Sequence, residues 1–100
     1  MQNIKQYVEQ NKQRFLDELF DLLRFPSVSA DPKYKPDVLE TADYVAKKLS
    51  DAGADKVEVC QTSGYPIVYG EKIVDATKPT VLVYGHYDVQ PPDPLELWKT

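Results

Sequence analysis

The chain has 100 residues, of which 42% are hydrophobic and 28% charged, values typical of a small soluble globular domain. Its formal net charge of −4, with the acidic excess in residues 51–100, argues against a nucleic-acid-binding protein, which would carry a basic surface. Cys60 is the only cysteine, which excludes a disulfide scaffold. No apolar run approaches the ~20 residues that span a bilayer, and the charged N-terminus does not resemble a signal peptide. We therefore expect a cytoplasmic protein with no membrane or nucleic-acid partner.

The first half of the chain predicts two amphipathic helices separated by a loop. Apolar residues recur at helical spacing over residues 3–25, and Pro26 is expected to end this helix because it disfavours helical geometry in the preceding residue. Proline and serine then predict a surface loop. A second helix is expected over residues 37–52, with Asp37 as its N-cap and Gly53 at its C-terminal cap.

The second half predicts strands. Residues 56–60 alternate polar and apolar, and residues 65–70 indicate a second strand, an edge strand because of Pro66. Residues 80–85 differ because four consecutive apolar side chains predict a strand buried on both faces. We therefore predict the α/β class, with helices packed on a mixed sheet around a buried central strand.

His86, the only histidine, and Asp88 follow the predicted central strand. Ligands bind outside the carboxyl ends of strands in open α/β sheets, and an extended backbone would direct both side chains to one side, with Cα atoms ~6.6 Å apart. A neutral imidazole is a good zinc ligand, and a carboxylate can orient its other N–H. A His-x-Asp pair is nevertheless more often a structural hydrogen bond, and a catalytic zinc needs about three protein ligands. These residues alone leave both interpretations open.

The longer run VLVYGHYDVQPPDPLELW resembles the first zinc-site motif of the aminoacylase/carnosinase-type zinc peptidase family. That family includes carboxypeptidase G and the succinyl-diaminopimelate desuccinylases, and the present run is most similar to its dipeptidase branch. LLRFPSVS and DVLETADYVAKKLSDAGA, upstream in the chain, resemble the same branch. The resemblance implies that residues 1–100 are the N-terminal segment of a zinc-exopeptidase catalytic domain. The remainder of that domain and a lid or dimerisation domain would lie outside the chain.

The resemblance also implies roles for two residues. His86 matches the family's first zinc ligand, and Asp88 matches the active-site aspartate that orients this imidazole. It implies two Zn²⁺ ions per active site in the complete enzyme, replaceable by Mn²⁺ or Co²⁺, and a homodimer. The expected activity is hydrolysis of dipeptides or similar small amides by a metal-activated water, with residues 1–100 inactive alone. The alternatives are an N-acyl amino acid deacylase or desuccinylase of the same superfamily, and a non-catalytic structural segment.

Overall fold

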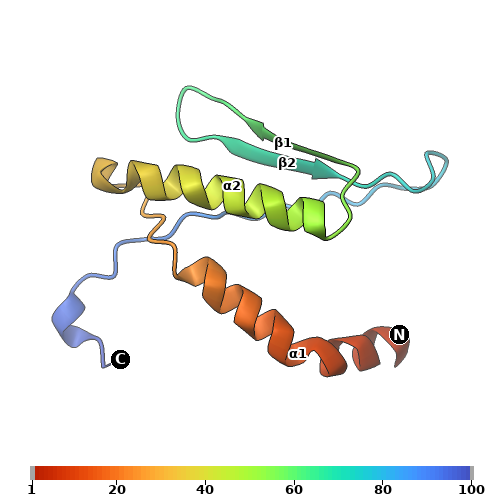
Figure 1. The fold of residues 1–100 in the computed structure, drawn as a ribbon, viewed down its shortest axis with the longest axis horizontal. Coiled ribbons are helices and arrows are strands. Elements are labelled where there is room, and N and C mark those ends of the chain that lie inside the picture. Colours follow the sequence, from red (N-terminus) through yellow and green to blue (C-terminus); the bar gives the residue numbers. More distant parts are fainter. Residues whose placement is uncertain (1, 100) are drawn as a thin grey trace.

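A two-stranded sheet, a helix packed against it and a second helix that diverges from both make up the fold (Figure 1). The computed structural model describes residues 2–99. The elements, in chain order, are helix α1 (Gln2–Leu23), the 3₁₀ turn η1 (Pro32–Tyr34), helix α2 (Lys35–Asp51), strands β1 (Lys56–Cys60) and β2 (Ile67–Glu71), and the 3₁₀ turn η2 (Leu95–Leu97).

Helix α1 confirms the helix predicted for the N-terminal part of the chain. Its polar face carries side-chain pairs at helical spacing, among them Arg14 with Glu18 at 3.3 Å. The helix ends at Leu23, three residues before Pro26. None of the helices within residues 2–99 has the length and apolar content needed to cross a lipid bilayer.

Helix α2 is also confirmed, but the predicted N-cap is wrong. Turn η1 runs directly into α2, and Asp31 caps η1 by accepting a 3.0 Å hydrogen bond from the backbone N–H of Lys33. The helix has therefore already begun when the chain reaches Asp37, which lies in the first turn of α2. A carboxylate there still interacts favourably with the helix dipole.

The C-terminal end of α2 matches the expectation for Gly53. This glycine has a φ of 102°, a left-handed conformation that glycine adopts without strain. The backbone N–H groups of Gly53 and Ala54 donate to the carbonyls of Ser50 and Leu49, at 3.0 and 3.1 Å. These two bonds form a Schellman cap, which turns the chain towards β1.

Strands β1 and β2 pair antiparallel, with Lys56 opposite Glu71 and Cys60 opposite Ile67. Helix α2 packs against both strands. Gly70 allows a close approach, since a β-carbon there would lie 3.0 Å from a methyl group of Leu49 on α2. The two predicted strands are therefore confirmed, the second beginning at Ile67, directly after Pro66.

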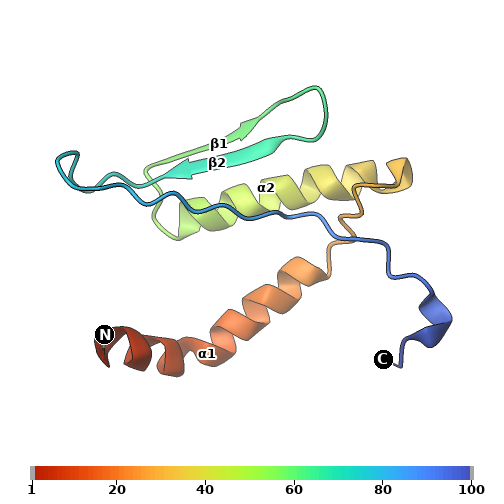
Figure 2. The same ribbon diagram turned by 180° about the vertical axis from the view of Figure 1, so that it is seen from behind.

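The predicted buried strand at residues 80–85 is wrong for the described structure. Figures 1 and 2 draw this segment as an extended coil, and the side chains of residues 81–84 are all more than 80% exposed. A strand requires a neighbour to accept and donate its backbone hydrogen bonds, and within residues 2–99 the sheet contains only β1 and β2. Within residues 2–99 no strand pairs with this segment, so its apolar side chains remain exposed.

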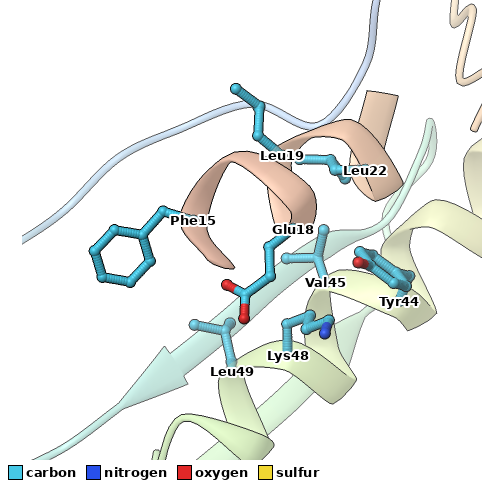
Figure 3. Close-up of a pocket in the computed structure, with 8 residues that line it drawn as sticks. All are labelled: Phe15, Glu18, Leu19, Leu22, Tyr44, Val45, Lys48 and Leu49. Atoms are coloured by element: carbon cyan, nitrogen blue, oxygen red, sulfur yellow. The ribbon is translucent and has the colours of Figure 1, made fainter. Parts of the chain in front are cut away.

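Helices α1 and α2 face one another across an open, largely apolar groove of about 370 Å³ (Figure 3). Its walls come from the second half of α1 and the second half of α2. The lining residues are Phe15, Glu18, Leu19, Leu22, Tyr44, Val45, Lys48 and Leu49. The buried side chains lie elsewhere, in residues 27–28, at Pro66 before β2, and in the first half of α2 at Val38, Thr41 and Ala42.

Candidate metal centre

The loop that follows α1 holds the backbone around Asp88. Val28 and Val89 form an isolated parallel β-bridge, in which the N–H of Val89 donates to the carbonyl of Ser27 at 2.9 Å. The hydroxyl of Ser27 donates to the carbonyl of Tyr87 at 2.8 Å. Ser27 and Val28 are almost completely buried, so these bonds are shielded from competing water.

A third segment fixes the residue between His86 and Asp88. The hydroxyl of Tyr87 donates to the carbonyl of Pro66, which immediately precedes β2, at 2.6 Å. Partial burial of the Tyr87 ring raises the pKa of its hydroxyl, so this group remains a donor at physiological pH. Residues 87–89 are thus tied both to the loop after α1 and to the start of β2.

The structure brings the two predicted site residues together. Nδ1 of His86 lies 3.0 Å from Oδ1 of Asp88 and 3.1 Å from the Asp88 carbonyl oxygen. The second carboxylate oxygen of Asp88 accepts a 2.5 Å hydrogen bond from the hydroxyl of Ser29. Chiefly this bond, and also the one with His86, lowers the pKa of Asp88, against an opposing effect of desolvation.

These contacts determine which nitrogen of His86 carries the proton. An ionised carboxylate and a carbonyl oxygen only accept hydrogen bonds, so Nδ1 must be the donor. In the neutral ring Nε2 then keeps its lone pair. The His86 side chain is 72% exposed, so Nε2 remains accessible. A neutral imidazole whose other N–H is held by a carboxylate is the form in which histidine binds metals.

The donor set fits one part of a metal site. His86 offers a ligand nitrogen with an orienting carboxylate behind it, but residues 2–99 hold no cluster of three or more histidine, cysteine, aspartate or glutamate side chains. Asp93 and Glu96, the other acidic residues near the motif in sequence, are exposed. A zinc ion would need ligands beyond those described here.

Ser29, Asp88 and His86 form a hydrogen-bonded chain that is unsuited to serine nucleophilic catalysis. The hydroxyl of Ser29 donates to the carboxylate of Asp88, whereas a nucleophilic serine must lie beside the imidazole that takes its proton. The arrangement therefore orients the imidazole and does not activate the serine.

Sequence reasoning missed the contributions of Ser27, Ser29 and Tyr87. The available signal was the segment FPSVS, whose two serines flank a valine in the loop after α1. Nothing in the sequence indicated that this loop would pair with residues 87–89, some sixty positions further along the chain.

No protein-family model matches the chain. It is 34% identical to the Cys-Gly metallodipeptidase DUG1 of Candida albicans over 105 residues, which covers 93% of this chain and 22% of that protein. It is 34% identical to the Cys-Gly metallodipeptidase dug1 of Schizosaccharomyces pombe over 111 residues, covering 100% and 23%. The chain is a relative of the Cys-Gly metallodipeptidases. It also shares 32% identity with the cysteinylglycine-S-conjugate dipeptidase of Corynebacterium striatum, over 87% of this chain and 21% of that protein.

The fold supports the same relationship. The solved structure of the dipeptidase Dug1p from Saccharomyces cerevisiae matches with a TM-score of 0.85 and 29% identity, over 95% of this chain and 22% of that one. The predicted α/β class is thereby confirmed. The chain spans between a fifth and a quarter of the length of these dipeptidase relatives, which agrees with the expectation that it represents a segment of a longer protein.

Proposed function

We propose that the whole protein is a zinc-dependent dipeptidase that hydrolyses Cys-Gly or similar small dipeptides. The likeness to the metallodipeptidases in both sequence and fold carries this proposal. The pairing of His86 with Asp88 supports it, because the pair supplies a metal ligand and its orienting carboxylate within the run that resembles the zinc-site motif.

In this proposal, His86 binds a zinc ion through Nε2, and Asp88 holds the imidazole by accepting the Nδ1 proton. A zinc ion held in such a site polarises a carbonyl group and makes a water molecule more acidic. Asp88 remains ionised at neutral pH, since its hydrogen bonds lower its pKa, so it keeps the imidazole in the metal-binding tautomer. The other ligands and the general base would come from residues outside the described chain.

The arrangement of the whole enzyme follows from the resemblance of the motif. Residues 1–100 would form the N-terminal segment of the catalytic domain, and the whole protein would be a cytoplasmic homodimer with two zinc ions per active site. The open groove between α1 and α2 and the exposed apolar residues 81–84 agree with a segment that is covered by further chain.

Metal analysis and substrate turnover of the whole protein test the proposal. Purified protein loaded with Zn²⁺, Mn²⁺ or Co²⁺ should hydrolyse Cys-Gly in preference to N-acetyl and N-succinyl amino acids. His86→Ala should lower bound metal and abolish turnover, while Ser63→Ala, at an exposed position, should change neither. Unchanged activity and metal content in His86→Ala would refute the role of His86. Turnover of N-acyl amino acids alone would instead indicate a deacylase.

A further inference from the structure

We propose that Ser29 is a positioning residue for the metal-binding imidazole: by occupying one oxygen of Asp88, its hydroxyl directs the other oxygen to Nδ1 of His86. This inference rests on the proposed function, since it assigns a residue to the same site. It names a group that lies fifty-nine positions from Asp88 in the sequence and that does not itself resemble a metal ligand.

The geometry around Asp88 carries the inference. Each carboxylate oxygen has its own partner, Ser29 at 2.5 Å on Oδ2 and His86 at 3.0 Å on Oδ1. A hydroxyl-to-carboxylate bond of this length is charge-assisted and stronger than a bond between neutral groups. With Oδ2 engaged, rotation of the carboxylate about its terminal torsion would break the bond to Ser29, and so Oδ1 stays directed at the ring.

The anchoring of the backbone explains why a single hydroxyl can have this effect. The neighbouring Ser27 holds both residues that flank Asp88, through its side chain to the Tyr87 carbonyl and through its carbonyl to the Val89 N–H. These two bonds align residues 27–29 with residues 87–89, so that the hydroxyl of Ser29 lies beside the carboxylate of Asp88. Ser29 is half-buried beside the buried residues 27–28, so its hydroxyl is not freely exchanged for water.

The Asp88 side chain is 44% exposed and the His86 side chain 72% exposed. Without Ser29, the carboxylate could turn one or both oxygens to solvent, which would leave the Asp88 carbonyl oxygen, 3.1 Å from Nδ1, as the remaining acceptor. The fraction of rings that adopt the other tautomer, with the proton on Nε2, would then rise. That tautomer presents no lone pair on the exposed nitrogen. Loss of the Ser29 hydroxyl is therefore expected to weaken metal binding without removing any metal ligand.

The first measurement needs no metal. In the metal-free whole protein, the ¹⁵N signals of the His86 ring, assigned by their absence in His86→Gln, report which nitrogen carries the proton at a pH where the ring is neutral. Wild type should show the proton on Nδ1. Ser29→Ala should show a mixture of tautomers, and Ser29→Thr, which keeps the hydroxyl, should restore the wild-type signal.

The second measurement is the affinity for Zn²⁺ alone, by competition with a chromophoric chelator. Ser29→Ala should weaken binding by about 10- to 100-fold, the range typical of groups that support a metal ligand, while Ser29→Thr should retain the wild-type affinity. Ser63→Ala is the matched control. Should Ser29→Ala fail to fold, Ser29→Val and Ser29→Thr provide a pair of equal shape that differs by the hydroxyl.

The outcomes separate this inference from the proposed function. Wild-type tautomer and affinity in Ser29→Ala, or equal impairment of the Thr and Val variants, would overturn the role of Ser29. If His86→Gln retains full Zn²⁺ affinity, the proposed metal role of His86 fails, but the tautomer measurement still decides whether Ser29 positions the ring.

Discussion

Two adjoining stretches of the chain, residues 80–85 and residues 86–89, behave very differently although both are extended. The first is the more apolar, yet its side chains at Val81, Leu82, Val83 and Tyr84 are the most exposed of the large hydrophobic residues, apart from Val74. The second contains the charged and polar motif, yet Tyr87, Asp88 and Val89 are each hydrogen-bonded to a distant segment. In this chain, specific hydrogen bonds to a buried loop position a segment, whereas hydrophobicity without a partner surface does not.

The largest effect is expected when two aspartates that each accept a hydrogen bond from a hydroxyl group are compared. Asp88 is bonded by the distant Ser29, and Asp75 by Thr77 within its own turn. In the whole protein, Asp88→Asn should lower both Zn²⁺ affinity and dipeptide turnover by about 10- to 100-fold, because an amide cannot hold the imidazole as an ionised carboxylate does. Asp75→Asn, in the segment that leads into residues 80–85, should change neither. Equal losses in the two variants would show that the anchored region has no special role.

A second test compares two valines. Val38 on α2 is 1% exposed and Val81 is 83% exposed. Val38→Ala should lower the free energy of unfolding of the chain by about 2 kcal/mol, since it removes buried methyl groups. Val81→Ala should change it by less than about 0.5 kcal/mol. Urea denaturation followed by circular dichroism measures both. In residues 1–100 alone, a loss in Val81→Ala as large as in Val38→Ala would mean that residues 80–85 are buried in solution by self-association.

A third test uses two tyrosines, one from each stretch. Tyr87 donates a 2.6 Å hydrogen bond to the Pro66 carbonyl, whereas Tyr84 is 89% exposed. Tyr87→Phe removes one partly buried hydrogen bond and should cost about 1 kcal/mol of unfolding free energy. Tyr84→Phe should be neutral. Amide hydrogen exchange at Val89 should also increase in Tyr87→Phe only; no change there would show that the bond to Pro66 does not help to hold the motif.

Much of the fold could be predicted because its information is local. The periodicity of α1 and α2, the glycine after α2 and the alternation in β1 each act over a few residues, and the structure confirms them. The N-cap of α2 was misplaced because η1 continues into the helix, so the cap that matters is Asp31, upstream. The strand at residues 80–85 failed because a strand depends on neighbours that the sequence of the strand does not specify.

In the candidate site too, the local contact could be predicted from the sequence and the long-range contacts could not. The pairing of His86 with Asp88 follows from a spacing of two residues, so it could be predicted. The contacts of Ser27, Ser29 and Tyr87 join residues that lie far apart in the chain, and no local sequence pattern predicts them. The shortage of zinc ligands could also be predicted from the sequence, because one histidine and few nearby carboxylates cannot complete a zinc site.

The smallest effect is expected at Asp75, where the hydrogen bonds are local and the group is exposed. The Thr77 hydroxyl, at 2.6 Å, and then the Thr77 backbone N–H, at 2.9 Å, lower the pKa of Asp75. A lowered pKa means that the ionised carboxylate is favoured in the folded turn. Its stabilising effect is present above the ordinary aspartate pKa of about 3.9 and disappears as the pH falls through the lower folded value. Thr77→Val should raise the pKa of Asp75 towards the ordinary value, as measured by the ¹³C shift of its carboxyl during a pH titration.

The control for this titration is Asp88, whose pKa should stay the same in Thr77→Val, because its partners come from residues 29 and 86. Mild denaturant sharpens the difference between the two regions. A turn that spans residues 75–77 can persist when the loop around Val28 separates from Val89, so the pKa of Asp75 should remain low while that of Asp88 returns towards its ordinary value. If both values change together, the turn at Asp75 and the anchored motif unfold as one cooperative unit. Residues 80–85, although exposed, would then couple the unfolding of the turn at Asp75 to that of the motif around Asp88.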